Sequence, residues 1–379
     1  MAKRRALVIG GSVGGLFAAH LLRHAGWDAF VYERSTGDLG DRGTGIGTRP
    51  ELFAVMRRIG LAADASLGVE VQGRVGLDRS GAVLHELAVR AVTSSWSRIW
   101  RPLRQALPDE CFASGKVFVD IEQDERRVAA IFEDGSRAEG DLLIAADGTH
   151  SAVRARLMPA IEPASAGYIA LRGVVDPDRL SPALQQLTFH NMVFGFPDGE
   201  LMLSIPMSIP NRDGRTCHFV WFRPRRHSDE ARPGRAVPAL TSSELGSLAP
   251  ELAAVVRATP QVFTQAIFDL ESPRIAYGRV ALIGDAAFVA RPHVATGVLK
   301  AAIDAESLVD ALAACGNDVA AGLDLYNSQR QPYGKALVAR GRHIGALVMA
   351  TGSERHETLM REYGSAGMVA DQPIMARLP

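Results

Sequence analysis

The sequence predicts an α/β fold in which a Rossmann-like nucleotide-binding lobe is interrupted by an inserted antiparallel β-sheet lobe. Three observations predict it. A strand, a glycine turn and a helix follow one another over residues 5–26; antiparallel strand patterns fill about 166–270; a second buried strand ends in a turn near residue 284 and is followed by long helices to about 350. The chain has 379 residues, more than one core usually serves, so two lobes are expected.

The order of these patterns makes the nucleotide-binding lobe discontinuous, since its last strand and helices come after the inserted sheet. A simple nicotinamide dehydrogenase usually completes its nucleotide domain in one block, so the interruption favours a flavin. We expect three nucleotide-lobe segments, two substrate-lobe segments and a loosely specified tail, namely 1–76, 98–165 and 273–350; 77–97 and 166–272; and 351–379.

The first motif is the run "ALVIGGSVGGLFAAHLLRHAGWDAFVYE" over residues 6–33. Glu33 follows Gly10 by 23 positions, near the spacing of the acid that binds a ribose hydroxyl in dinucleotide folds. The usual middle glycine is replaced, because the turn contains Gly10, Gly11, Ser12, Gly14 and Gly15. The motif alone leaves NAD, NADP, FAD and S-adenosylmethionine open, as well as a turn that binds nothing.

An export signal is the alternative for this N-terminus, since Lys3, Arg4 and Arg5 precede an apolar run. The glycines oppose it, because each disfavours a hydrophobic helix by roughly 1 kcal/mol against alanine. Lysine plus arginine and aspartate plus glutamate number 42 each, so no global charge favours nucleic acid or a membrane. Three cysteines, far apart and without a C-x-x-C pair, predict a reducing cytoplasmic setting with neither disulfides nor a metal site: Cys111, Cys217 and Cys315.

Two further acidic motifs lie where a buried strand ends in a loop, the place where open α/β sheets bind ligands. Asp147 and Gly148 end the strand in "DLLIAADGTHSAVR", and Gly284 and Asp285 end the strand in "RVALIGDAAFVARPHVATG". An Asx turn at Asp147 and a helix cap at Asp285 are the structural alternatives.

Taken together, "GGSVGG" with Glu33, "ADGTHSAVR" and "LIGDAAFVARPHVATG" resemble the single-component FAD-dependent aromatic hydroxylases, the group that includes 4-hydroxybenzoate hydroxylase. "YERS", "RGTGI", "AGYIALRG" and "GRVALIGDAAFVARPH" look most like its 2,6-dihydroxypyridine hydroxylase branch, and the likeness runs from about residue 5 to 345. The resemblance implies a GR2-type fold and non-covalent FAD reduced by NADH or NADPH. It also implies O2 as co-substrate and a flavin C4a-hydroperoxide that hydroxylates a small hydroxylated aromatic or N-heteroaromatic compound.

The resemblance also implies roles for single residues. Glu33, with Arg34 beside it, would hold the adenosine ribose, and Asp285 with Gly284 the ribityl chain. Asp147, Gly148 and Arg154 would serve FAD and NAD(P)H binding. The isoalloxazine would be lined by the loop from Pro292 through Ala295 and Thr296 to Gly297. Three positions depart from the family pattern, and we expect them to touch the ring pocket: Leu171, Ala295 and Thr296.

On the substrate side, His293 is the candidate group that activates the ring, and Arg172 the candidate that orients an anionic substrate or contacts the flavin. The alternatives are that His293 only shapes its loop and that Arg172 forms an ordinary ion pair; His190 and His218 are expected to be structural. An aromatic-rich set could roof a dry cavity or could be plain core: Phe189, Met192, Phe194, Phe196, Phe219, Trp221 and Phe222.

Other functions stay open from sequence. The same flavin could support epoxidation, Baeyer-Villiger insertion or oxidative decarboxylation, and a flavin-binding protein without turnover or an NAD-dependent dehydrogenase are the remaining alternatives. The oligomeric state is open, with a homodimer as one alternative.

Overall fold

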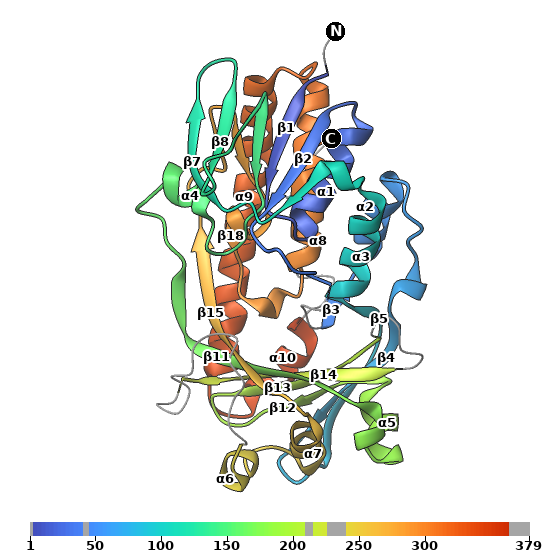
Figure 1. Ribbon diagram of the computed structural model, residues 1–379. Coiled ribbons are helices and arrows are strands. Elements are labelled where there is room, and N and C mark those ends of the chain that lie inside the picture. Colours follow the sequence, from blue (N-terminus) through green and yellow to red (C-terminus); the bar gives the residue numbers. More distant parts are fainter. Residues whose placement is uncertain (1–2, 41–44, 209–214, 226–239, 364–379) are drawn as a thin grey trace.

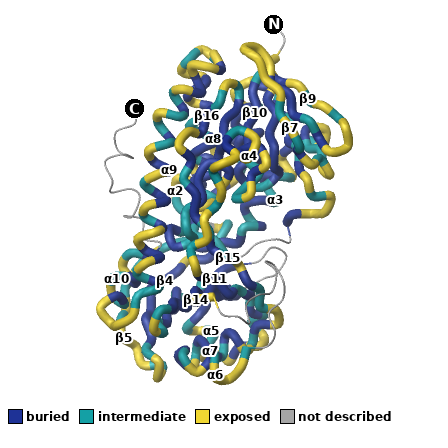
Figure 2. The backbone as a smooth tube through the Cα atoms, turned by 90° about the vertical axis from the view of Figure 1, so that its left-hand side faces the viewer, coloured by how far each residue is buried: buried dark blue, intermediate teal, exposed yellow. Residues whose placement is uncertain are grey.

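The computed structural model describes residues 3–40, 45–208, 215–225 and 240–363. The chain forms two stacked lobes, a mainly parallel sheet with its helices above and a large mixed sheet below, and one long helix runs beside both (Figure 1). The strands in the middle of both lobes are buried, whereas exposed residues gather at outer loops and on the outer side of the long helix (Figure 2).

The upper lobe contains the predicted Rossmann-like sheet of six strands in the order β16-β17-β10-β1-β2-β6. All neighbours are parallel except β16 and β17. The central strands are buried on both faces, as their apolar sequences predict. The strands are β1 (Arg5–Ile9), β2 (Asp28–Glu33), β6 (Phe112–Ser114), β10 (Leu142–Ala145), β16 (Ala276–Tyr277) and β17 (Val280–Leu282).

Helices from both ends of the chain complete this lobe. The first helix, α1 (Val13–His24), packs against α8 (Gly297–Ala314), and a Cβ at Gly14 would lie 3.3 Å from the Ala301 Cβ. The remaining helices of this half are α2 (Pro50–Arg58), α3 (Trp96–Ala106), α4 (Ala152–Leu157) and the long α9 (Val319–Met349).

Residues 118–145 contain four strands that belong to two different sheets. A separate small sheet contains β7 (Phe118–Gln123), β8 (Val128–Phe132) and β9 (Arg137–Gly140), while β10 joins the parallel sheet. The sequence of β9, "RAEG", is mostly polar, and the strand is held in the small sheet by its backbone pairing with β8.

The lower lobe contains a nine-stranded sheet in the order β18-β15-β11-β14-β13-β12-β4-β5-β3. It is antiparallel as predicted except between β12 and β4, which are parallel. The strands are β3 (Gly45–Thr48), β4 (Val69–Leu77), β5 (Val83–Ser95), β11 (Ala164–Val175), β12 (Asn191–Gly195), β13 (Leu201–Met207), β14 (Thr216–Pro224), β15 (Phe263–Glu271) and β18 (Phe288–Val289).

Three short helices cover the outer face of this sheet: α5 (Pro182–Thr188), α6 (Ser242–Leu245) and α7 (Pro250–Ala258). The other face points toward the upper lobe and α9. The segment expected as a tail from residue 351 contains a further helix, α10 (Glu354–Glu362), and its Leu359 and Met360 are fully buried. The rest of that predicted tail, 364–379, lies outside the described residues. Among the described helices, none combines the length and the apolarity that a membrane crossing needs.

Candidate active site

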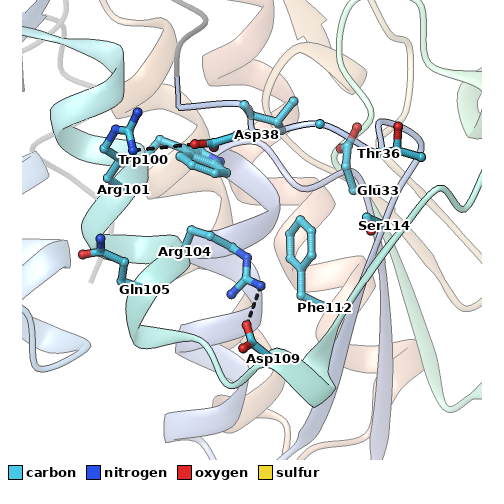
Figure 3. Close-up of a pocket in the computed structure, with 12 residues that line it drawn as sticks. Glu33, Thr36, Asp38, Trp100, Arg101, Arg104, Gln105, Asp109, Phe112 and Ser114 are labelled. Carbon is cyan, nitrogen blue, oxygen red and sulfur yellow. Dashed lines mark hydrogen bonds and ion pairs between the residues drawn. The ribbon is translucent and has the colours of Figure 1, made fainter.

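Three adjoining hollows follow the carboxyl ends of the parallel strands. The strand-end hollow, about 260 Å³, is lined by Glu33, Arg34, Asp147 and Gly148. It shares Ser12, Trp96, Ala146 and Gly148 with the interlobe pocket, about 500 Å³, which reaches down to the large sheet. It also shares Glu33 and Leu39 with the outer hollow, about 610 Å³, beside α3 (Figure 3). The three acidic motifs predicted from sequence therefore gather along one groove.

The glycine turn leaves no room for a side chain at Gly10 or Gly15. Gly10 has a φ of +109°, and a Cβ there would lie 2.4 Å from the Ala146 carbonyl oxygen. A Cβ at Gly15 would lie 1.9 Å from the Gly10 carbonyl oxygen. Ser12 is the N-cap of α1 but its side chain makes no capping bond, so the hydroxyl and the first N–H groups of the helix are available at the groove.

Glu33 fastens this turn. Its Oε2 atom accepts a hydrogen bond of 2.7 Å from the Gly11 N–H, and its Oε1 atom accepts one of 2.8 Å from the Ser35 N–H. Each carboxylate oxygen can accept a second bond, so a ribose hydroxyl can still be held. The Trp100 indole N–H donates to the Gly11 carbonyl at 2.9 Å and supports the turn from α3.

Asp147 and Asp285 both line the groove. The Asp147 Oδ1 atom is buried and has no hydrogen-bond partner among the described residues, which marks a place for a ligand donor. Asp285 accepts a bond of 2.9 Å from the Lys300 ammonium, and its side chain is 47% exposed. Lys300 was not predicted from the sequence. The signal that could have revealed it is a lysine in the first turns of the mostly apolar helix α8, where the structure buries it.

Arg154 lies behind the groove and lines none of the three hollows. Its guanidinium donates to the Ala286 carbonyl at 3.1 Å and to the Thr149 carbonyl at 2.6 Å. It therefore ties the turn after β10 to the turn after β17 and positions Asp147 and Asp285.

The loop before α8 closes the upper side of the interlobe pocket, to which Pro292, Ala295, Thr296 and Gly297 all contribute. Ala295 adopts the left-handed conformation at a φ of 50°, a region that favours glycine over other L-residues. The Thr296 Oγ1 atom is buried without a partner among the described residues, and nothing lies within 4 Å of a Cβ built on Gly297. The loop thus leaves an open, polar-edged space at the start of α8.

His293 does not line this space, and the geometry favours the alternative that it shapes its loop. It is fully buried, its Nε2 atom is 2.5 Å from the Tyr168 hydroxyl oxygen, and its ring contacts Phe222 edge-on. Within the 3-10 turn Pro292–Val294, Pro292 and Val294 line the pocket. The imidazole of His293 instead packs against the rings of Tyr168, Phe222 and Tyr363. Desolvation lowers the pKa of His293 to about 3, so the ring is neutral at pH 7.

Arg172 lines the interlobe pocket, as expected for a residue that meets substrate. The surface of the large sheet that bounds this pocket, here called the sheet wall, combines apolar with a few polar side chains: Arg74, Arg172, Met192, Ile205, His218, Val220, Gln265 and Ile267. His218, expected to be structural, is part of it. Arg74 was missed because nothing in the strand pattern of "VEVQGRVGL" shows which face the arginine takes across a register shift.

The expected aromatic roof is mostly core. Of the set named above, only Met192 lines the pocket. Phe219 and Trp221 alternate to the outer face of β14, under α7, while Phe222 packs around His293. Leu171 also lies on the outer face, opposite Trp221, so this departure from the family pattern does not touch the ring pocket.

The outer hollow adds cationic groups that the sequence reasoning did not single out. Arg101 and Arg104 are three residues apart and share one side of α3, so their helical spacing could have revealed them (Figure 3). Arg104 pairs with Asp109 at 2.7 Å and lies over the Phe112 ring, and Arg101 is 3.6 Å from Asp38. They add positive charge beside Glu33.

Residues 3–341 of the chain match the FAD binding domain family. The chain belongs to this family. It is 30% identical over 375 residues to 2,6-dihydroxypyridine 3-monooxygenase of Paenarthrobacter nicotinovorans, with 92% of each chain covered. The solved 2,6-dihydroxypyridine-3-hydroxylase from Arthrobacter nicotinovorans superposes with a TM-score of 0.84 at 29% identity, covering 93% of this chain and 94% of that one. Klebsiella pneumoniae HpxO, solved with FAD and uric acid, gives 0.83 at 25% identity, covering 99% and 97%.

These relatives confirm the resemblance drawn from the three motifs, the fold it implied and the class of enzyme, an FAD-dependent aromatic monooxygenase. The groove fits FAD on its own geometry. It offers a glycine cradle without room for side chains, two helix N-termini, and unpartnered buried polar atoms at Asp147 and Thr296.

Proposed function

We propose that this member of the family uses FAD, NADH or NADPH, and O2 to hydroxylate a small hydroxylated aromatic or N-heteroaromatic compound. One observation carries the proposal: the groove that begins at Glu33 continues without a break past Asp285 and opens into a pocket of about 500 Å³ between the loop 292–297 and the sheet wall. A nucleotide cofactor fits the groove, and a single small ring fits the pocket at its end.

The cofactor-binding roles follow the groove. Glu33 and Arg34 would hold the adenosine ribose, and the turn from Gly10 to Gly15, with Ser12 and the N–H groups of α1, would bind the pyrophosphate. Asp285, whose side chain is oriented by its bond with Lys300 and by the turn at Gly284, would accept hydrogen bonds from the ribityl hydroxyls. Asp147 and Gly148 would contact the cofactor between these two ends.

FAD, when bound, supplies the redox chemistry: it accepts a hydride from the reduced nicotinamide and activates O2 for transfer of one oxygen atom. The protein supplies electrostatics at the flavin edge. The N-terminus of α8 includes Gly297 and the Thr296 hydroxyl, which has no partner among the described residues. It presents its positive dipole end to the pocket and would stabilise negative charge there by roughly 0.3–2 kcal/mol.

The protein also excludes water from the substrate pocket. Met192, Ile205, Val220, Ile267 and Leu337 exclude water from the space beside the loop 292–297. Activated oxygen next to water is lost as peroxide, so this apolar lining favours transfer to the ring. Arg172 would orient the substrate against the sheet wall.

The sequence contains no second glycine-rich dinucleotide-binding motif after residue 33 that could hold the reductant. NADH or NADPH would therefore bind transiently at the surface of the same lobe. We also propose a cytoplasmic setting, because Cys111, Cys217 and Cys315 are all free thiols.

Replacing Asp285 tests the cofactor assignment. Asp285→Ala is expected to fold, by circular dichroism, and to lose FAD on purification, because the ribityl hydroxyls lose their acceptor; absorbance gives the FAD content per chain. Asp324→Ala, on an exposed part of α9, is the matched control and should keep full FAD content. Full flavin occupancy in Asp285→Ala would contradict the assigned role.

Screening hydroxypyridines, phenols and aromatic acids for faster NADH and NADPH oxidation tests the activity. At least one class is expected to accelerate oxidation severalfold. A yellow protein that never consumes either nucleotide would instead support a non-catalytic flavoprotein, and a colourless protein that binds NAD tightly would support a dehydrogenase.

A further inference from the structure

The loop 292–297 closes one side of the pocket, yet few side chains attach it to the rest of the protein. Three residues of the segment 291–297 have polar side chains, namely Arg291, His293 and Thr296. The Thr296 Oγ1 atom is buried without a partner among the described residues, so it attaches nothing. Arg291 and His293 are therefore the polar attachments of this segment, and neither lines the pocket.

Both attachments meet at Tyr168, on β11. The Tyr168 hydroxyl oxygen is 2.5 Å from the His293 Nε2 atom. Burial raises the pKa of the Tyr168 phenol to about 12, while the Arg291 guanidinium, 5.6 Å from the ring centroid, acts to lower it. The phenol is therefore protonated at neutral pH and can form a hydrogen bond with the imidazole. One side chain of the large sheet thus holds the loop at two points.

His293 depends on the Tyr168 hydroxyl for its hydrogen bonding. The imidazole is fully buried, and its Nδ1 atom has no partner among the described residues. Without the Tyr168 hydroxyl neither ring nitrogen would be paired, and a buried polar group without a partner disfavours the conformation that buries it. The backbone around His293 would then relax toward a conformation that gives the imidazole a partner. The position of the loop therefore depends on this one bond.

A carboxylate fixes the second attachment. Asp269, on β15, is 4% exposed and accepts a bond of 2.8 Å from the Arg291 guanidinium. Arg342, on α9, donates to the same carboxylate at 2.7 Å. Burial acts to raise the pKa of Asp269, but its bonds with Arg342 and Arg291 lower the pKa overall, so the carboxylate is ionised at neutral pH. Arg291 is thereby held over the Tyr168 ring.

The long helix α9 has glycines where this cluster approaches it. A Cβ at Gly345 would lie 2.7 Å from the Tyr168 hydroxyl oxygen and 2.8 Å from the Arg291 Nη1 atom. One turn earlier, a Cβ at Gly341 would lie 2.9 Å from the Arg291 backbone nitrogen. Residues four apart share one face of a helix, so both glycines leave room for the same cluster. Neither glycine lines the pocket.

We propose that Tyr168 is a positioning residue, which keeps the loop 292–297 in place beside the bound flavin through His293 and Arg291. The inference rests on the proposed function for the place of the flavin ring next to this loop. Because α8 follows the loop directly, a displaced loop carries the positive end of the helix dipole away from the flavin edge. Tyr168 lines none of the three hollows, so it acts on the flavin through the loop.

The experiment measures the affinity for FAD and the reduction potential of the bound FAD, and it needs neither substrate nor turnover. Tyr168→Phe keeps the ring and removes the hydroxyl. We expect it to bind FAD about tenfold more weakly than the wild type, equivalent to about 1.4 kcal/mol. We also expect a more negative potential, because less positive charge reaches the reduced flavin. Fluorescence titration of the apoprotein gives the affinity, and reduction against a reference dye gives the potential.

Gly345→Ala displaces the same cluster from the side of α9. Alanine favours a helix over glycine, so the substitution does not weaken the helix itself. The added methyl group meets the ends of the Tyr168 and Arg291 side chains, which must move. We expect a folded protein, by circular dichroism and thermal unfolding, whose flavin potential shifts in the same direction as in Tyr168→Phe. If Tyr168→Phe does not fold, Gly345→Ala decides the question.

A double variant distinguishes positioning from simple packing. In Tyr168→Phe combined with His293→Leu both partners of the bond are apolar, so no ring nitrogen is left buried and unpaired. The thermal stability is expected to recover relative to Tyr168→Phe alone. The potential is expected to stay shifted, because the directional bond that held the loop is still missing.

Tyr277→Phe is the matched control. It removes a hydroxyl on β16 that contacts the Met158 Sδ atom, and Tyr277 lines none of the three hollows. Its FAD affinity and flavin potential should equal those of the wild type.

A wild-type potential in folded Tyr168→Phe would overturn the proposal, and so would a wild-type potential in folded Gly345→Ala. A potential that recovers together with stability in the double variant would show that Tyr168 only fills the core. None of these results bears on whether the protein hydroxylates a ring, because no turnover is measured. Conversely, a protein with the expected shifts that never oxidises NADH or NADPH would refute the proposed function and leave the role of Tyr168 standing.

Discussion

The groove and the interlobe pocket are built from different parts of the chain. The groove consists of backbone at the ends of β1, β10 and β17, with glycines wherever a Cβ would collide. The pocket consists of side chains from β4, β11, β12, β13, β14 and β15 and from residues around α10. A cofactor shared by a family needs a fixed shape, whereas a substrate is chosen by side chains, so changes in the second set alter specificity at little cost to the first.

The largest effect is expected from a substitution in the glycine turn of the groove. Gly15→Ala places a Cβ 1.9 Å from the Gly10 carbonyl oxygen, and backbone on both sides cannot move apart. We expect loss of FAD and destabilisation by about 3 kcal/mol, measured by urea unfolding. Gly297→Ala is the contrasting control: with nothing within 4 Å of its Cβ it should unfold like the wild type while binding FAD more weakly. Normal FAD affinity in Gly15→Ala would contradict the tight turn.

A smaller effect is expected in the pH dependence of stability, which reports on His218 in the pocket. His218 has a pKa of about 3 when folded, against about 6.5 when unfolded. Between these values the unfolded chain binds the additional proton, so the stability is unaffected above pH 6.5 and falls as the pH drops toward 3. Between pH 7 and pH 5 the wild type should lose about 2 kcal/mol more than His218→Gln.

Urea titrations at the two pH values measure this difference. His343→Gln, whose ring is 56% exposed on α9, is the control and should follow the wild type. Parallel losses in wild type and His218→Gln would show that His218 is not buried in neutral form.

The smallest effect lies where the groove meets the pocket. Ala295 is held at a φ of 50°, which costs an L-residue about 1 kcal/mol and costs glycine nothing. Ala295→Gly should raise the unfolding free energy by about 0.5 kcal/mol, since the added freedom of the unfolded chain offsets part of the relief. If Ala295→Gly is less stable than the wild type, the packing of the Ala295 methyl group contributes more free energy than the backbone strain costs.

The same division explains what could be read from the sequence. Glycine turns and acids at strand ends are local, so Gly10, Glu33, Asp147 and Asp285 were located correctly along one groove. Side-chain direction is not local. His293 was a candidate for the pocket because of its place in the loop, but its ring packs against Tyr168 and Phe222 instead. Arg74 reaches the pocket across a register shift that the pattern of β4 does not show.

Long-range packing accounts for the remaining differences. The segment from residue 351 was expected to be a loosely specified tail, yet Leu359 and Met360 of α10 are buried against the lower lobe. Leu171 was expected at the ring pocket as a departure from the family pattern, but alternation along β11 places it on the outer face.

The most direct test of the central claim follows the oxygen atom. FAD-loaded protein would be given NADH or NADPH, isotopically labelled O2 and each ring that accelerates nucleotide oxidation, and the products would be weighed by mass spectrometry. The account predicts a ring product carrying one labelled oxygen. Nucleotide oxidation that yields only peroxide, or a product whose new oxygen is unlabelled, would contradict it.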